Sequence, residues 1–165
     1  MKTVSSRAIL KNGARARGAR RVSAPGTRVA HRGSRLADVL QAEPLALHTA
    51  VMQGLAYDAL EEFRQTYALT LSEAIRVVQI PERTLARRRE AGRLHPQESD
   101  RLVRIARLFA QATRLFNGNT AEARAWLSRP QRVLGNAVPL EVATTEVGAQ
   151  EVERALLRIE HGVFA

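Results

Sequence analysis

The chain has 165 residues, of which 45% are apolar and only 4% aromatic, so a hydrophobic core must be built mainly from Leu, Val, Ile and Ala. It contains no cysteine, which excludes disulfides and thiolate metal sites and fits the reducing cytoplasm, where we expect the protein to act. No run of about 18 apolar residues occurs, so we expect no membrane-spanning helix and no membrane partner.

The formal net charge of +10 is concentrated at the beginning of the chain. Residues 1–35 hold ten of the 26 Lys and Arg residues and no acidic residue, so residues 36–165 carry 16 basic and 16 acidic side chains. Like charges with little apolar surface predict a disordered arm. Three interpretations stay open: an arm that contacts DNA phosphates, an Arg-rich transit peptide, or a dispensable tail from a start codon placed too far upstream. The segment lacks the apolar stretch of a secretory signal.

Residues 36–68 predict three helical segments. The segment 36–43 ends before Pro44, which suits the first turn of a helix that runs to Gly54. A third helix follows before residue 68, with apolar residues at the helical period. We interpret these helices as packing elements. His48 is interpreted as a packing histidine, because no partner ligand lies at metal spacing from it.

Residues 69–92 predict two short helices joined by a tight corner, the pattern of a helix-turn-helix. Thr70 and Glu73 form a capping-box pattern before the first helix, and Pro81 suits the first position of the second. Leu85 is expected to point inward. The opposite face carries the candidate DNA-binding residues Arg83, Thr84, Arg87 and Arg88. Arg side chains can read guanine or hold phosphates, and the alternative is an ordinary solvated helix face.

The second half of the chain predicts one long helix and then shorter ones. Pro96 begins a helix with five turns of apolar stripe, which ends near Asn117. Thr120 is expected to cap the next helix and Thr145 the last one, with an irregular segment between them. The only tryptophan, Trp126, fits either a core residue or an interface anchor.

The sequence shows no pattern for catalysis. Its four histidines have no metal-ligand spacing, and it lacks both a Gly-rich phosphate loop and a G-x-S-x-G turn. We therefore expect a binding protein with no enzyme activity, no metal site and no cofactor.

From about His48 onward the chain resembles the Xre/MbcA/ParS-like antitoxins, which are paired with RES-domain toxins in type II toxin–antitoxin systems. The strings that carry the resemblance are LTLSEAIRVVQIPERTLARRREAGRL, ESDRLVRIARLFAQATRLFNGNTAEARAWLSRP and LGNAVPLEVATTEVGAQEVERALLRIEHGVFA. The first is similar to the helix-turn-helix of that family and the other two to its toxin-binding domain. Val78 and Gln79 stand where Leu-Gly is usual in the corner, and the basic arm is not part of the pattern.

The resemblance implies an all-α fold with an Xre-like helix-turn-helix domain, which we expect at 36–94, and a toxin-binding domain, which we expect at 95–165. The basic disordered arm expected at 1–35 precedes both domains. It implies operator DNA as one partner and a cognate RES-domain toxin that degrades NAD as the other, with the toxin's active site occluded. It further implies a homodimer that forms a hetero-oligomer with the toxin. The toxin-binding residues that it implies are Trp126, Leu140, Thr145, Val152, Leu156, Arg158, Glu160 and Gly162.

Two functions are compatible with this pattern. The first is an antitoxin that neutralises a RES toxin and also binds the promoter of its own operon. The alternative is a stand-alone helix-turn-helix transcriptional regulator without a toxin partner. An adjacent reading frame for a RES domain would favour the first, and a solitary gene would favour the second.

Overall fold

A computed structural model describes residues 35–162 of the chain. The basic arm expected at 1–35 therefore lies outside the described residues, apart from Arg35. The described part folds into α-helices and one short 3-10 helix, with no strand, which confirms the all-α prediction. Its elements in chain order are α1 (Leu36–Leu40), α2 (Pro44–Gln53), α3 (Tyr57–Thr66), α4 (Leu71–Val77), α5 (Glu82–Ala91), α6 (Pro96–Leu115), α7 (Thr120–Leu127), η1 (Arg132–Leu134), α8 (Pro139–Val142) and α9 (Glu146–Glu160).

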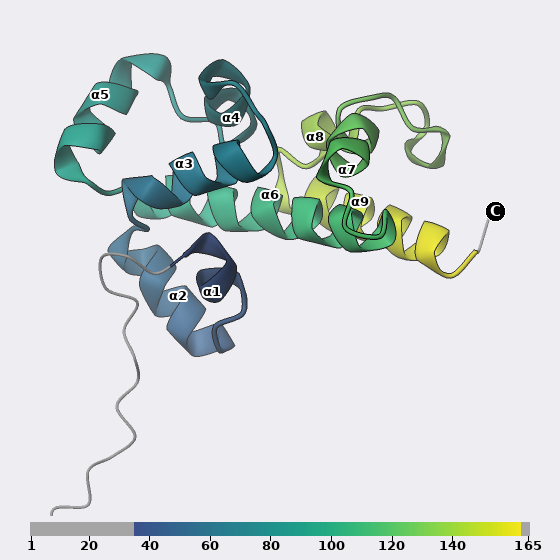
Figure 1. Cartoon of the computed structure of the whole chain (residues 1–165), viewed down its shortest axis with the longest axis horizontal. Coiled ribbons are helices and arrows are strands. Elements are labelled where there is room, and N and C mark those ends of the chain that lie inside the picture. The colour runs from purple at the N-terminus through teal and green to yellow at the C-terminus, as the bar shows by residue number, and fades with distance from the viewer. Residues whose placement is uncertain (1–34, 163–165) are drawn as a thin grey trace, which may run out of the picture.

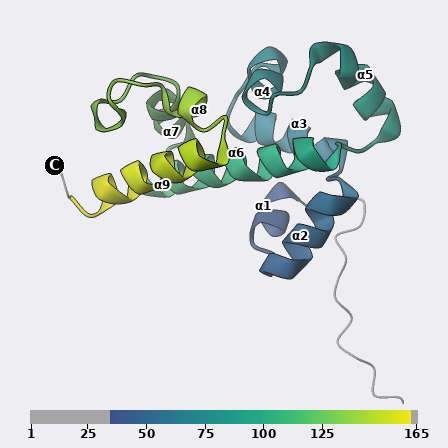
Figure 2. The same cartoon turned by 180° about the vertical axis from the view of Figure 1, so that it is seen from behind.

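Helix α6 is the axis on which the other helices are arranged (Figure 1). Near its N-terminal half, α3, α4 and α5 lie on one side and α1 and α2 on the other, whereas α7, α8 and α9 gather around its C-terminal half (Figures 1 and 2). The predicted apolar stripe of this helix is confirmed, because five of its members are almost fully buried: Leu102, Ile105, Ala106, Phe109 and Ala112. One helix thus supplies core residues to both halves of the molecule.

An aromatic cluster joins α3 to α6. The ring centroid of Phe109 lies 5.2 Å from that of Phe63, edge to face, and 4.5 Å from that of Tyr67. Phe63 and Phe109 have no exposed surface. Aromatic pairs in such geometries add about 0.5–1.5 kcal/mol to the stabilisation from burial alone. Three of the seven aromatic residues of this chain therefore meet where the helix-turn-helix half contacts the long helix.

Most of the predicted helix starts are confirmed. The Glu73 N–H donates to Thr70 Oγ1 at 3.2 Å and the Thr70 N–H donates to a Glu73 carboxylate oxygen at 2.7 Å, which completes the capping box. Pro44 occupies the first turn of α2. Thr145 Oγ1 accepts from the Gly148 N–H at 3.1 Å and caps α9. Pro81 precedes α5 as its N-cap, one residue earlier than expected.

The prediction that Thr120 caps α7 is wrong. Asn119 is the N-cap, and its side-chain oxygen accepts from the N–H groups of both Ala121 and Glu122 at 3.1 Å. A carboxamide oxygen can accept from two of the unpaired N–H groups of a first turn at once, and asparagine is among the best N-cap residues. Thr120 is consequently the first residue of the helix.

Two glycines are required by close backbone approaches. Gly54 has φ +82°, and a Cβ there would lie 2.2 Å from the carbonyl oxygen of Leu94. This contact brings the end of α2 against the segment after α5, where the Leu94 N–H also donates to the Leu55 carbonyl at 2.9 Å. In α9, a Cβ on Gly148 would lie 1.8 Å from the carbonyl oxygen of Val142. Glycine thus permits the tight contact between α8 and α9.

Candidate functional site

The corner between α4 and α5 depends on a residue in the left-handed region. Gln79 has φ +56°, and the Ile80 N–H reaches back to the Ile75 carbonyl at 2.8 Å. Val78 and Ile80, on either side of it, are 0% and 4% exposed. A non-glycine residue in this conformation costs about 1–2 kcal/mol. The burial of its two apolar neighbours offsets this cost, so the tight corner forms without the glycine that the family pattern favours there.

Helix α5 stands out from the body of the protein and has no buried residue (Figure 1). Leu85 is half-buried and packs against the core, as the sequence predicts. Arg83 and Arg87 lie four residues apart on one exposed face. Neither forms an ion pair with another residue between 35 and 162. Their guanidinium groups are therefore available to an external anion such as a phosphate.

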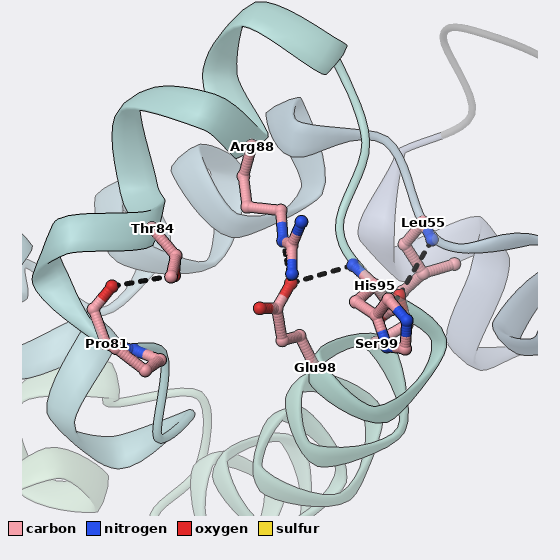
Figure 3. Close-up of polar contacts among 7 residues, drawn as sticks. All are labelled: Leu55, Pro81, Thr84, Arg88, His95, Glu98 and Ser99. Carbon is pink, nitrogen blue, oxygen red and sulfur yellow. Dashed lines mark hydrogen bonds and ion pairs between the residues drawn. The ribbon is translucent and has the colours of Figure 1, made fainter.

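Arg88 differs from its two neighbours because it has a partner within the chain. Its Nε donates to a carboxylate oxygen of Glu98 at 2.7 Å, and the same oxygen accepts from the His95 N–H at 2.7 Å (Figure 3). The side chain of Glu98 is only 6% exposed and that of Arg88 18%. Burial alone would raise the pKa of Glu98, but the hydrogen bonds from Arg88 and from the His95 backbone outweigh it and hold that pKa below the usual range.

This ion pair gives Arg88 a structural role that the sequence did not reveal. It joins the C-terminal half of α5 to the first turn of α6, and α5 has few other contacts with the body of the protein. A buried carboxylate needs such a partner to remain ionised at low cost. Arg88 therefore helps to position α5, and the DNA contact expected of it from the sequence stays a prediction.

Thr84, the remaining candidate DNA residue, also has an internal partner. Its hydroxyl donates to the Pro81 carbonyl at 2.8 Å, which closes the first turn of α5 (Figure 3). The residue is half-buried. Its hydroxyl oxygen can still accept a hydrogen bond, but its donor is used within the helix. The four sequence candidates thus divide into two exposed arginines, Arg83 and Arg87, and two residues with internal partners.

Ser99 is a supporting residue that sequence analysis missed. It has no exposed surface, and its hydroxyl donates to the His95 carbonyl at 3.0 Å while it accepts from the Leu55 N–H at 2.9 Å (Figure 3). The hydroxyl thereby ties the connection between α2 and α3 to the start of α6. Ser99 and Glu98 resemble ordinary first-turn residues in the sequence, and no local signal marks their burial.

The second candidate surface belongs to α7, η1, α8 and α9. Among the residues that the resemblance implies for toxin binding, Val152 is 0% and Leu156 1% exposed, so both side chains build the core. Trp126 and Leu140 are half-buried and pack against that core. The exposed members of the set are Thr145, Glu160 and Gly162.

Arg158, the last member of that set, is half-buried and carries an ion pair. Its Nη2 lies 3.0 Å from a carboxylate oxygen of Glu151, two turns earlier on α9. Its Nε is buried and has no hydrogen-bond partner among the described residues. The hydrogen bonds from Arg158 are the main reason why the pKa of Glu151 is lowered. The charge of Arg158 is thus partly neutralised before any partner arrives.

The connection between α7 and α8 is an ordered loop, although the sequence indicated only an irregular segment. The Gln131 N–H donates to the Ala137 carbonyl at 3.0 Å, and the Gln131 side-chain amide donates to the Trp126 carbonyl at 2.7 Å. These bonds hold Arg132 and Val133 in exposed positions, with Val133 39% exposed. The loop lies on the same side of the molecule as the C-terminal end of α9 (Figure 1). It adds candidate contact residues that the family motif did not indicate.

The two halves are also joined by direct polar contacts. Arg124 of α7 lies 2.8 Å from a carboxylate oxygen of Glu73 in α4, and it donates to the Ala68 carbonyl at 2.7 Å. Arg104 of α6 lies 2.7 Å from Glu146 at the start of α9. The second unit is therefore attached to the helix-turn-helix pair as well as to the long helix.

Two features that would indicate another kind of function are absent from residues 35–162. Between residues 35 and 162, no group of three or more His, Asp or Glu side chains is arranged to hold a metal ion. Within the same range, no helix is both long and apolar enough to cross a membrane.

Comparison with known protein families divides the chain into a helix-turn-helix domain and a toxin-binding domain. Residues 46–107 match an antitoxin Xre-like helix-turn-helix domain, and residues 111–162 match an antitoxin Xre/MbcA/ParS C-terminal toxin-binding domain. The two matches meet within α6, which is therefore shared by the two domains. The boundary between 94 and 95 that the sequence suggested stays a prediction.

Three curated relatives carry the name antitoxin Xre. The relative from Yersinia enterocolitica is 36% identical over 117 residues, which cover 70% of this chain and 79% of the relative. The relative from Pseudomonas putida is 35% identical over 122 residues, covering 73% of this chain and 75% of the relative. The relative from Photorhabdus laumondii is 31% identical over 120 residues, covering 72% and 81% respectively.

Proposed function

Because the chain belongs to the Xre antitoxin family, we propose that it neutralises a cognate RES-domain toxin and regulates its own operon. In this proposal the second unit, α7 to α9, binds the toxin and occludes the active site with which the toxin degrades NAD. The exposed face of α5 binds operator DNA. The chain itself carries out no reaction, and it acts in the cytoplasm, where the operator lies.

The observation that supports the proposal is that the two candidate binding surfaces, on α5 and on α7 to α9, lie at opposite ends of α6. Helix α5 lies at the N-terminal end of α6, whereas the α7–α8 loop and the C-terminal end of α9 lie at its other end (Figures 1 and 2). A toxin at the second surface therefore leaves α5 free. Such an arrangement supports simultaneous binding of DNA and of a protein partner, through a homodimer that forms a hetero-oligomer with the toxin.

The experiment that tests the toxin partner is co-expression with the product of the neighbouring gene. We expect a RES-domain protein encoded there to co-purify with this chain, and growth arrest by that protein to be relieved when both are expressed. Growth arrest that persists despite normal levels of this chain, with no complex on a sizing column, would reject the proposal.

Arg83 and Arg87 on α5, which form no ion pair within residues 35–162, favour a second candidate function, a stand-alone DNA-binding regulator without a toxin partner. They support DNA binding whether or not a toxin exists. Binding to the operon's promoter together with a gene neighbourhood that encodes no RES domain would favour this alternative.

A further inference from the structure

Helix α5 carries two carboxylates on a surface that is otherwise basic. Glu82 lies in its first turn and Glu90 in its last, and both are exposed. Neither forms an ion pair with another residue between 35 and 162, whereas Glu73 and Glu98 nearby each pair with an arginine. DNA phosphates repel a carboxylate on a surface that contacts them, so such a group opposes binding unless the DNA offers it a donor.

The carboxylate of Glu82 has no partner from its own helix. The positions three and four residues after it, where a helical cation could pair with it, hold Leu85 and Ala86. Ala86 lies one turn after Glu82 on the same exposed side, and Arg83 and Arg87 form the adjacent stripe. The opposite side of α5 faces α6 (Figure 3). Glu82 therefore points outward beside the two arginines that are available to DNA.

A carboxylate distinguishes the bases by the hydrogen bonds that it cannot make. It accepts hydrogen bonds and donates none. At its major-groove edge cytosine presents only a donor, the N4 amino group, whereas guanine presents two acceptors and thymine an acceptor and a methyl group. Adenine presents its N6 amino group beside the acceptor N7, which repels a carboxylate. Cytosine is therefore the base that suits an exposed glutamate best.

We propose that Glu82 determines part of the operator sequence by accepting a hydrogen bond from the N4 amino group of a cytosine. The N-terminal residues of a recognition helix contact base edges, and Glu82 is the first residue of α5. Its carboxylate also repels any sequence that places an acceptor at this position, so it selects by repulsion as well as by attraction. The inference rests on the proposed operator binding and adds one base that the operator contains.

Glu90 has the same side chain but a different position. It lies eight residues, about 12 Å, further along the helix than Glu82, away from the end that contacts base edges. Arg87 lies three residues before it, close enough to screen its charge. Glu90 acts only through its charge and weakens binding to every DNA sequence alike. It is the matched control, because glutamine at either position removes one negative charge from α5.

Selection from a random double-stranded DNA library by the purified full-length chain, at fixed salt, tests the proposal. We expect the wild type to enrich a motif with an invariant C·G pair that Glu82→Gln replaces by A·T, because glutamine pairs with adenine N6 and N7. Two duplexes that differ only at this pair should be discriminated about tenfold by the wild type and in the reverse order by Glu82→Gln. Glu90→Gln should keep the wild-type motif and bind both duplexes more tightly.

The outcomes separate this inference from the proposed function. A role of Glu82 in the start of the helix alone would leave the selected base unchanged, and circular dichroism shows whether each variant retains its helices. An unchanged motif in Glu82→Gln, or equal tightening on both duplexes as in Glu90→Gln, would overturn the inference and leave operator binding intact. A wild-type chain that enriches no motif would overturn operator binding together with the inference.

Discussion

Arg124 and Glu73 form an ion pair of 2.8 Å that joins α7 of the toxin-binding domain to α4 of the helix-turn-helix. Glu73 is also the carboxylate of the capping box that begins α4. Its pKa is lowered, chiefly by the hydrogen bond from the Thr70 backbone and then by the Thr70 hydroxyl and Arg124. One carboxylate thus serves both the start of the helix-turn-helix and its attachment to the neighbouring domain.

We predict that Arg124→Ala lowers the free energy of unfolding by about 1 kcal/mol, because it removes a half-exposed ion pair and a hydrogen bond to the Ala68 carbonyl. Urea denaturation followed by circular dichroism measures the change. Arg154→Ala is the control: its side chain is 66% exposed and its ion pair with Glu151 lies within one helix, so we expect no measurable effect. Equal losses in the two variants would contradict a special role for the contact between the domains.

Arg87→Ala should weaken binding to the operon's own promoter by about 1–3 kcal/mol if this arginine reads a base. The reason is that Arg87 is exposed on α5 and has no ion-pair partner among residues 35–162. A gel shift at fixed salt measures the affinity, with Arg154→Ala on α9 as a control for loss of one positive charge. An affinity equal to that of the wild type would show that Arg87 does not contact the promoter DNA.

Arg88→Ala should act through stability rather than through base contacts. In the intact chain the side chain of Glu98 is only 6% exposed, and without Arg88 its carboxylate keeps only the hydrogen bond from the His95 N–H. We expect a loss of about 2–3 kcal/mol in the free energy of unfolding, measured by urea denaturation, since an unpaired buried charge is costly and water can reach only part of it. A variant with wild-type stability but reduced affinity for DNA would show that Arg88 contacts DNA after all.

The same ion pair makes stability depend on pH in the acid range. The pKa of Glu98 is lower in the folded chain than in the unfolded one, so folding is favoured by the ionised form. This contribution is fully present above the unfolded-state pKa of a glutamate, about 4.3, and is lost as pH falls through the lower folded-state value. Glu98→Gln should therefore make the free energy of unfolding fall less steeply with acid. Identical slopes for the variant and the wild type below that pH would contradict this assignment.

The sequence predicted the helices and the overall fold class well, because caps, prolines and the apolar period are local signals. Thr70 with Glu73, Pro44 and Thr145 all begin helices as expected. The N-cap of α7 was misjudged, since Asn119 and Thr120 are adjacent and both are suitable caps. A local sequence pattern cannot show which of two adjacent residues is the N-cap, because this depends on which side chain reaches the free N–H groups of the first turn.

The candidate site was predicted less well, because a side chain's role depends on what distant segments place beside it. Arg87 and Arg88 are equivalent in the sequence, and only the approach of Glu98 from α6 separates them. The resemblance implied that Val152 and Leu156 bind the toxin, but both side chains are buried in the core, and a motif alone does not show that they are inaccessible to a partner. Exposure is a property of the packed structure and could not be read from the resemblance.

The outward face of α9 provides the test for toxin binding. Removal of the chain from Thr145 onward would delete Val152 and Leu156 from the core, so loss of protection in such a truncation would not separate binding from folding. We predict instead that Leu157→Glu abolishes protection in a co-expression growth test while circular dichroism and the free energy of unfolding stay unchanged, because Leu157 is 42% exposed. Leu71→Glu is the matched control, since Leu71 is 40% exposed but lies on α4. Full protection by Leu157→Glu, or equal loss in both variants, would exclude this face of α9 as the toxin-binding surface.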